Sequence, residues 1–320
     1  MLFTLLALVS LAVLADESHV ALDKKDAGVD NDDVLLFSFF RDNGKNGVYL
    51  AVSEDGVHFS PLNDDMPVMK PAPWEEQNIT RDPSMVFHDG KFYAVWSSGW
   101  SGKCFGYAES KDLVHWSEPV KVVPPFPANQ IPRNTWAPEI CWDPGQKNFM
   151  IFWSSQINAK REKQIFVTRT VDGKEFSVPE LSINPNFNCI DGSMALDDSE
   201  DAARWVMIYK NAEPDAKNLY VATAPSDFSC PWSLEPNPIV GRGTAVRPNE
   251  CAEGPSLVKW KGSWYLYWDA YMNRHYSMAS STDLKSWTDR TAELQMPPHP
   301  RHGTVFRAPR SAVGWLKQRE

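Results

Sequence analysis

One short pattern recurs five times along this chain and constrains its fold more than any other feature. Each copy is a strand-like run, then a turn that carries Asp, then a closing aromatic residue. The closing aromatics are Phe59, Trp116, Phe176, Trp232 and Trp287, so successive copies lie 57, 60, 56 and 55 residues apart. A period this regular over most of a chain indicates one supersecondary unit repeated five times.

Each repeat holds more strands than the motif itself. An aromatic, β-branched run precedes every copy, as strands require: the runs are Val34–Phe40, Lys91–Ser98, Asn148–Ser155, Arg204–Asn211 and Ser263–Ala270. Four of these runs follow a shorter strand-like segment across an Asp-Gly, Asp-Pro-Gly or Lys-Gly turn. The Pro-rich linkers leave room for a fourth, outer strand, and no segment shows helical periodicity.

These repeats predict an all-β fold, a five-bladed β-propeller formed by residues 34–320 as a single domain. Radial repetition of small sheets protects their edges, which an open sheet of this size could not do. The first repeat lacks its innermost strand, and the segment His302–Pro309 near the C-terminus is a spare one. We therefore expect the C-terminal strand to complete the first blade and close the ring.

The N-terminal region is distinct from the repeats. Residues 1–15 are apolar and end in Val13-Leu14-Ala15, as in a secretory signal peptide, although the absence of a basic segment leaves a membrane anchor as the alternative. Residues 16–33 form an acidic, Lys-containing lead-in that we expect to be flexible. We predict a secreted monomer that has no membrane attachment once the signal peptide is cleaved.

The net charge of −9 argues against nucleic acids and anionic membranes as partners. The chain has five cysteines, Cys104, Cys141, Cys189, Cys230 and Cys251. In a secreted protein some would pair, and the parallel positions of Cys189 and Cys251 suggest a bridge between repeats, with two buried free thiols as the alternative. Asn78-Ile79-Thr80 is a sequon for N-glycosylation.

The innermost strands of a propeller surround its central channel, so the first residues of these strands meet at one mouth. Those positions hold Asp82, Trp136-Ala137, Asp191, Glu253 and His302. A single Asp before Pro or Gly often does no more than start a turn. Three carboxylates that converge on one axis raise one another's pKa, and such a costly arrangement marks a functional site.

Three carboxylates without a catalytic Cys, a Ser-His pair or a phosphate loop suit acid/base cleavage of a glycosidic bond. One carboxyl must protonate the leaving oxygen and needs a raised pKa, while another stays ionised and activates water. Asp82 and Glu253 lie two blades apart, as an acid and a base separated by water require, and Asp191 is in the blade next to Glu253.

The motifs RDPS at Arg81–Ser84, WAPE at Trp136–Glu139, IDGS at Ile190–Ser193, EGPS at Glu253–Ser256 and HG at His302–Gly303 resemble those of glycoside hydrolase family 43. The resemblance spans roughly residues 34–309. It implies an inverting hydrolase of arabinofuranosidic, xylosidic or some galactosidic bonds in plant-type polysaccharides. In this family pattern Asp82 is the general base, Asp191 the orienting residue that modulates pKa, and Glu253 the general acid.

The remaining site residues follow from the same pattern. Trp100 and Trp136 are the expected sugar-stacking platforms, and Arg81 either contacts substrate or pairs with Asp82. The resemblance places His302 near a central water or metal ion, so it allows a structural calcium or other ion at the centre, but no cofactor is required and no metal ligand is assigned. Antiparallel alternation brings further loop residues to the same mouth, namely Arg41-Asp42, Gln156–Asn158, Lys210-Asn211 and Asp269–Tyr271.

Two other functions stay open at this point. A retaining propeller of the invertase and fructanase type shares the Arg-Asp-Pro string, but its Asn-Asp-Pro-Asn-Gly motif is absent here. A sugar-binding propeller without catalysis is the other alternative. The sequence specifies neither the sugar and linkage nor exo or endo action.

Overall fold

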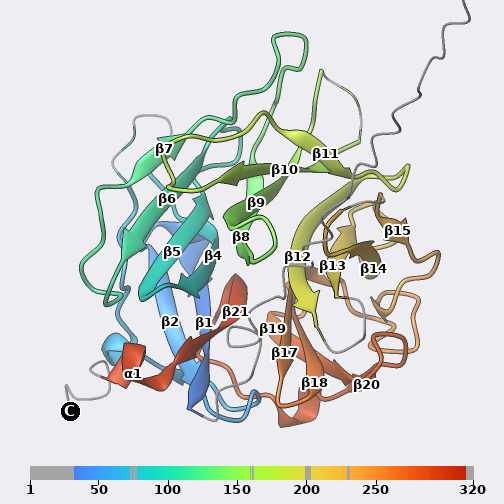
Figure 1. The fold of residues 1–320 in the computed structure, drawn as a ribbon. Coiled ribbons are helices and arrows are strands. Elements are labelled where there is room, and N and C mark those ends of the chain that lie inside the picture. Colours follow the sequence, from blue (N-terminus) through green and yellow to red (C-terminus); the bar gives the residue numbers. More distant parts are fainter. Residues whose placement is uncertain are drawn as a thin grey trace, which may run out of the picture.

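The strands of this protein form five antiparallel sheets around a central axis (Figure 1). The computed structural model describes residues 32–72, 74, 78–158, 160, 162–198, 203–228 and 231–314. The predicted all-β, five-bladed propeller is confirmed within these residues. The predicted signal peptide and nearly all of the lead-in lie outside them.

Each blade runs outward from the axis, with three long strands and one short outer strand, or two in blade 4. Blade 1 contains β21 (Arg301–Pro309), β1 (Asp33–Phe40), β2 (Val48–Ser53) and β3 (Ser60–Pro61), and blade 2 contains β4 (Arg81–His88), β5 (Lys91–Ser97), β6 (Phe105–Ser110) and β7 (Val120–Val122). Blade 3 contains β8 (Trp136–Asp143), β9 (Asn148–Ser155), β10 (Gln164–Thr170) and β11 (Glu180–Ile183). Blade 4 contains β12 (Cys189–Asp197), β13 (Arg204–Asn211), β14 (Asn218–Pro225), β15 (Ser233–Leu234) and β16 (Val240–Gly241), and blade 5 contains β17 (Glu253–Trp260), β18 (Ser263–Ala270), β19 (His275–Ser281) and β20 (Thr288–Asp289).

Helical structure is confined to short segments in the described residues. These are α1 (Arg310–Val313) and the 3-10 turns η1 (Asp42–Gly44), η2 (Asn63–Asp65) and η3 (Thr291–Glu293). None of the described helices has the length and apolarity that a membrane crossing would need.

The last strand closes the ring, as predicted. β21 pairs antiparallel with β1, with Val34 opposite Ala308 and Phe37 opposite Val305. β21 also packs against β4 and β17, the innermost strands of the two neighbouring blades. The C-terminal strand therefore belongs to the inner wall of the channel and not to an outer edge.

The hydrophobic core lies between blades and is rich in aromatic rings. Its apolar clusters each combine residues of neighbouring blades; one joins Leu36 and Leu50 of blade 1 to Trp96 of blade 2. The largest fully buried side chains include Trp96, Trp153, Trp205, Trp260 and Trp268. Burial of this apolar surface is what holds one blade against the next.

The repeated Asp has a clear local function. In four copies its Oδ1 accepts backbone N–H groups two and three residues further on, as Asp112 does from Val114 and His115 at 3.0 and 2.8 Å. The same bonds recur at Asp55, Asp172 and Asp283. These Asp-based turns, which replace missing backbone partners, account for the sequence period.

The described cysteines Cys104, Cys141, Cys189 and Cys251 are all free thiols, and Cys230 lies outside the described residues. The suggested bridge between Cys189 and Cys251 is therefore not formed. Cys251 instead accepts a hydrogen bond from the Arg242 guanidinium, with the sulfur 2.9 Å from Nη2.

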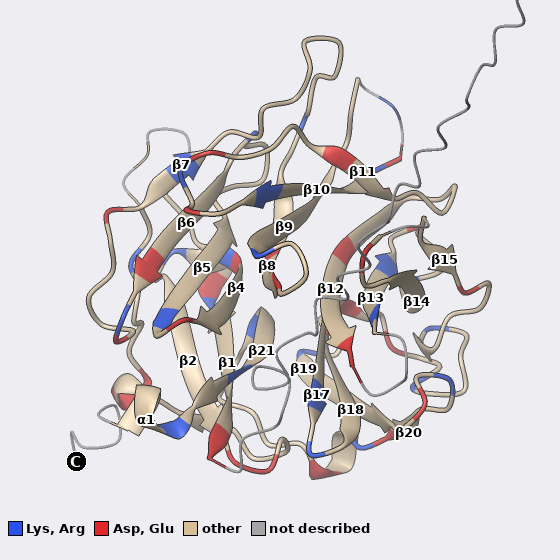
Figure 2. Cartoon of the chain, viewed as in Figure 1, with Lys and Arg blue, Asp and Glu red and all other residues tan. Residues whose placement is uncertain are grey.

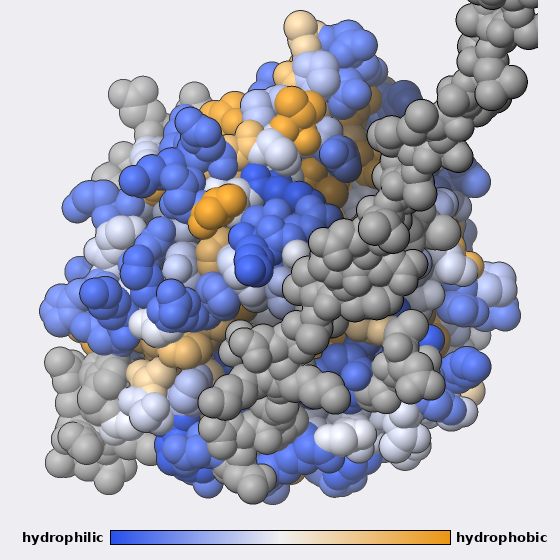
Figure 3. Space-filling view, in the orientation of Figure 1, coloured by the Kyte–Doolittle hydropathy of each residue, from blue (hydrophilic) through white to orange (hydrophobic). Residues whose placement is uncertain are grey.

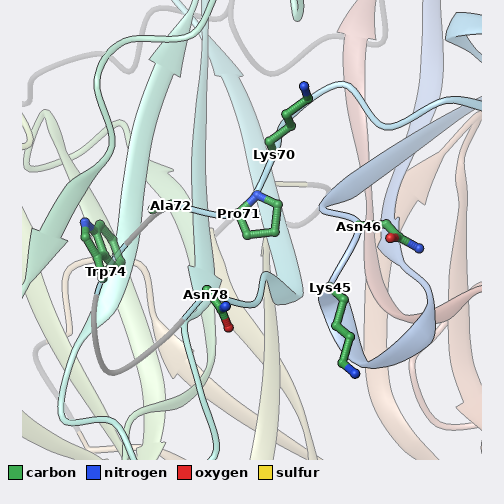
Figure 4. A pocket seen from close by; sticks show the side chains of 7 residues that line it. All are labelled: Lys45, Asn46, Lys70, Pro71, Ala72, Trp74 and Asn78. Carbon is green, nitrogen blue, oxygen red and sulfur yellow. The ribbon is translucent and has the colours of Figure 1, made fainter.

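The sequon residue Asn78 is exposed and lines a surface hollow of about 710 Å³ together with Lys45, Lys70 and Trp74 (Figure 4). None of the axial carboxylates lines this hollow. Glycosylation of Asn78 stays a prediction.

Candidate active site

The inner strands bend at a common point, one residue after the start of each motif. The residue at the bend has a left-handed backbone in four blades: φ is 48° at Asp82, 46° at Ala137, 55° at Asp191 and 52° at Gly254. Here each inner strand shifts register against its neighbour, as at a β-bulge. The bend therefore lies at the equivalent residue, near the start of the inner strand, in blades 2 to 5.

The bend corrects one prediction about equivalent positions. Asp82 and Asp191 are bend residues, but Glu253 precedes the bend and Gly254 occupies it. Cross-strand pairing shows the same offset. Glu253 lies opposite Asp269, just as Arg81 and Trp136, the residues before the bends of blades 2 and 3, lie opposite Ser97 and Ser154. The acid candidate therefore projects from a different position from the other two carboxylates.

A series of bonds between blades fixes the bend residues. Ala137 N donates to Ser97 Oγ at 2.8 Å, and Asp191 N donates to Ser154 Oγ at 3.0 Å. His302 N likewise donates to Asp269 Oδ2 at 3.2 Å. In each case a side chain near the end of one blade's second strand holds the inner strand of the next blade.

Asp82 lies at the mouth on β4 and is 9% exposed. Its Oδ2 accepts a hydrogen bond from Ser97 Oγ at 2.7 Å, and its Oδ1 is 3.5 Å from His302 Nδ1. Arg81 is more distant, with Nη2 3.9 Å from the same Oδ1. Asp82 is thus oriented by a neutral hydroxyl, which leaves its carboxylate available as a base.

His302 connects the last strand to this carboxylate. Its ring packs so closely on Gly254 that a Cβ built on the glycine would lie 2.5 Å from His302 Cγ. Burial lowers the pKa of His302, but the surrounding carboxylates, Asp82 and Asp191 first, raise it above its usual value overall. When it is protonated, His302 places positive charge among the acidic residues of the channel.

Asp191 is the most enclosed of the three predicted carboxylates, at 6% exposure. Its Oδ2 accepts a hydrogen bond from Gly254 N at 3.3 Å and lies 4.0 Å from Lys210 Nζ. Burial raises the pKa of Asp191 and outweighs the attraction of His302 and Lys210. Asp191 therefore lies directly beside the strand that carries Glu253.

Glu253 is held by two cations. Lys210 Nζ is 2.8 Å from its Oε2, and Arg301 Nη2 is 3.2 Å from its Oε1. Burial raises the pKa of Glu253, but Lys210 and the other cations lower it below its usual value overall. The lowered pKa of Glu253 is the opposite of the raised pKa that we predicted for a general acid at this position.

A fourth axial carboxylate, Glu139, was missed as a site residue. The position after the bend proline or glycine holds Ser84, Ser193, Ser256 and Thr304 in the other blades, whereas blade 3 carries Glu139. Its oxygens accept hydrogen bonds from Ser84 Oγ at 2.8 Å and Thr304 Oγ1 at 3.1 Å. Burial raises its pKa to about 7. The break in the hydroxyl pattern was the available signal.

Trp100 and Trp136, the two expected sugar-stacking residues, lie against each other and form an aromatic rim; their contact with sugar stays a prediction. Trp136 Nε1 donates to the Trp100 carbonyl at 2.7 Å, and the two rings meet edge to face at 6.2 Å. Arg81 lies over the Trp100 ring at 4.1 Å, and Lys163 over the Trp136 ring at 4.7 Å. Trp100 is 57% exposed, so it has a free face for a ligand.

Only some of the loop residues expected at the channel mouth contact the axial residues. Lys210 and Asp269 contact the axial residues, whereas Arg41 instead binds the Asp65 carboxylate with two hydrogen bonds of 2.9 and 2.8 Å. Charged residues occupy the starts of β4 and β21, close to the centre of the ring (Figure 2).

The residues around His302 fit a metal ion poorly. Within the described parts of the chain, no three His, Cys, Asp or Glu side chains converge as a metal cage would need. Calcium is held by six to eight oxygen ligands, which one carboxylate beside a histidine does not provide. No step below depends on a metal, and a central ion stays a prediction.

Fold and site together define a class: a five-bladed propeller hydrolase whose carboxylates meet at the axis. Over residues 32–311 the chain matches the sequence model of a family related to glycoside hydrolase family 43, described as "Probable glycosyl hydrolase domain". The chain belongs to this family of glycosidases, and the predicted resemblance to family 43 is confirmed.

Solved structures agree on the fold. A thermostable family-43 glycoside hydrolase is 17% identical, with a TM-score of 0.54 over 70% of this chain and 78% of its own. The catalytic domain of a family-62 alpha-L-arabinofuranosidase from Coprinopsis cinerea is 14% identical, with a TM-score of 0.53 over 75% of this chain and 77% of its own. An exo-beta-1,3-galactanase from Phanerochaete chrysosporium is 12% identical, with a TM-score of 0.51 over 74% of this chain but 53% of its own. No curated protein matches the chain by sequence.

Proposed function

We propose that this protein is a secreted, inverting glycosidase that cleaves arabinofuranosidic or xylosidic bonds, or galactosidic bonds, in plant-type oligo- and polysaccharides. The observation that carries this proposal is the convergence of Asp82, Asp191 and Glu253 from three blades on one mouth, each with different partners. Distinct environments for paired carboxylates are what an acid and a base require.

The base in this scheme is Asp82. Its carboxylate takes a proton from a water molecule, whose oxygen forms a bond with the anomeric carbon as the bond to the leaving oxygen breaks. Glu253 donates its proton to that leaving oxygen, and both carboxyls return to their starting states by exchange with solvent. Asp191, beside the strand that carries Glu253, orients the acid and modulates its pKa.

The sugar class is supported by the aromatic rim and by the structural neighbours, which include an arabinofuranosidase and a galactanase. Trp100, whose side chain is 57% exposed, offers a surface for a sugar to stack on, next to the Trp136 ring. The visible described surface in Figure 3 is mainly hydrophilic, with apolar residues in small groups, which suits a polar ligand. The apolar N-terminal segment supports secretion, and a monomer is sufficient because one chain supplies all site residues.

A panel of p-nitrophenyl α-L-arabinofuranoside, β-D-xyloside, β-D-galactoside and β-D-galactofuranoside tests the activity, and NMR of the first product anomer tests the stereochemistry. We expect inversion, and retention would favour the invertase-like alternative. Glu253→Ala should lower turnover on unactivated substrates by 10²-fold or more while aryl glycosides with good leaving groups keep measurable turnover, and Asp82→Ala should lower both.

One observation favours a non-catalytic sugar-binding propeller as the second candidate. Glu253 is ion-paired with Lys210 and Arg301, and its pKa is lowered, so it is a poor acid in this arrangement. This candidate predicts no hydrolysis of any substrate in the panel and binding of the same sugars with unchanged affinity by Glu253→Ala.

A further inference from the structure

Lys210 departs from a pattern that blades 2, 3 and 5 keep; in blade 1 the equivalent residue is Phe40, opposite Arg301. The residue paired with the start of the inner-strand motif is Ser97 in blade 2, Ser154 in blade 3 and Asp269 in blade 5, but Lys210 in blade 4. The first three residues each accept an N–H from the next inner strand. An ammonium has no acceptor, so Lys210 cannot make this bond.

The strand beside Lys210 is rearranged accordingly. By the pattern of blades 2, 3 and 5, Gly254 N would donate a hydrogen bond to the side chain at position 210. It donates to Asp191 Oδ2 instead. Asp191 therefore performs the structural task that a serine performs in blades 2 and 3. This releases the side chain at position 210 for another role.

The Lys210 side chain points into the candidate active site. Its Nζ lies 2.8 Å from Glu253 Oε2, 4.0 Å from Asp191 Oδ2 and 5.2 Å from the centre of the Tyr271 ring. The side chain is 4% exposed. A buried ammonium is costly unless it is paired, and a serine satisfies the fold at this position elsewhere, so packing alone does not explain the lysine.

We propose that Lys210 is a positioning residue that, together with Arg301, holds the Glu253 carboxyl at the channel mouth and sets the pH above which Glu253 stops donating a proton. This inference rests on the proposed glycosidase function. It makes Lys210, the cation nearest to Glu253, the main source of the low proton affinity of this carboxyl.

Other charges face Glu253 from every strand around it. Asp191 on β12 and Asp269 on β18 oppose its ionisation, while Arg301 and His302 on β21 favour it, as Lys210 does. Asp82 faces the same channel from β4, and Tyr271 follows β18. Arg301 stays in place when Lys210 is replaced, so the remaining pair should keep Glu253 near its present position.

Lys210→Ser is the sharpest variant, because it installs the residue that blades 2 and 3 already use. Removing an opposite charge within 4 Å raises a carboxyl pKa, so the alkaline limb of kcat/KM on an unactivated glycoside should move up by about one pH unit or more. Lys210→Met tests the same charge loss with a side chain of similar length, and Lys210→Arg should leave the limb near its original pH. Circular dichroism verifies folding of each variant.

Lys163→Met is the matched control, since Lys163 is a cation at the same mouth that lies over Trp136 and, unlike Lys210, forms no ion pair with Glu253 in the part of the chain that the structure describes. It should not move the alkaline limb. A limb that stays in place in both Lys210→Ser and Lys210→Met, or that moves equally in Lys163→Met, overturns the proposal.

A second readout is independent of activity. ¹³C NMR of Glu-labelled protein, with Glu253→Gln to assign the resonance, should show a higher pKa of Glu253 in Lys210→Ser than in the wild type. An unchanged titration overturns the role of Lys210 even if no glycoside is hydrolysed, whereas an upward shift in a protein without hydrolase activity would reject only the proposed function.

Discussion

Thr304 and Glu139 are hydrogen-bonded across the propeller axis, with Thr304 Oγ1 donating to Glu139 Oε1 at 3.1 Å. They belong to blades 1 and 3, which are not neighbours in the ring. The bond spans the channel behind the mouth where Asp82 and His302 meet. Glu139 is 6% exposed, so its ionisation is coupled to the stability of the whole ring.

The raised pKa of Glu139 predicts a pH-dependent stability. The folded-state value of about 7 lies above the usual 4.5, so the folded protein binds a proton that the unfolded chain has released between these pH values. The free energy of unfolding should therefore fall from pH 4.5 to pH 7, by up to about 3 kcal/mol. Glu139→Gln should remove this loss and be more stable than the wild type at pH 8, as measured by urea unfolding.

The control for this experiment is Glu180→Gln, which changes an exposed carboxylate on β11 of the same blade. Its unfolding curves should follow the wild type at every pH. A Glu139→Gln protein with the wild-type pH dependence would show that Glu139 ionises as freely in the fold as in the unfolded chain.

Gly254 is predicted to be irreplaceable because of His302. A Cβ at position 254 would lie 2.5 Å from the His302 ring, so Gly254→Ala should displace the ring from Asp82 and lower both turnover and melting temperature. Gly262→Ala is the control, since Gly262 also has a positive φ, 83°, but nothing within 4 Å of an added Cβ. Backbone strain alone costs about 1–2 kcal/mol, and Gly262→Ala should lose only this and keep its turnover.

The exposed ring of Trp100 predicts an effect on substrate binding alone. Trp100→Ala should raise KM several-fold on oligosaccharides with little change in the melting temperature, because the ring already faces solvent. Val171→Ala removes an even more exposed apolar side chain, 72% against 57%, from the turn after β10 and should leave KM unchanged. Equal KM values for wild type and Trp100→Ala would remove Trp100 from the site.

Ring closure predicts a sharp dependence on the C-terminal strand. A chain that ends at Pro300 lacks β21, which leaves the buried strand β1 without its inner partner, and should not unfold cooperatively on heating. A chain that ends at Gly314 retains β21 and α1 and should unfold as the full-length protein does. A cooperative transition in the shorter chain would contradict the closure role of β21.

The architecture was predictable because the sequence repeats with a regular period, in which buried aromatic residues and Asp-containing turns recur from blade to blade. Asp82 and Asp191 were found for the same reason, since each stands where other blades need no carboxylate. The register of Glu253 was missed although a signal existed, because Pro83, Pro138 and Pro255 align Asp82 with Gly254 and not with Glu253. The contact between Lys210 and Glu253 depends on how two side chains from neighbouring blades fill one space, which no repeat encodes.

The closing strand has a temporal consequence. Arg301 and His302 stand at the start of the last strand, more than 200 residues after Asp82 along the chain. A growing polypeptide that already carries Asp82, Asp191 and Glu253 still lacks the two residues that contact Glu253 and Asp82 from blade 1. The site is therefore complete only after the last strand has been synthesised. A chain whose synthesis stops before Arg301 contains every predicted catalytic carboxylate but lacks a complete active site.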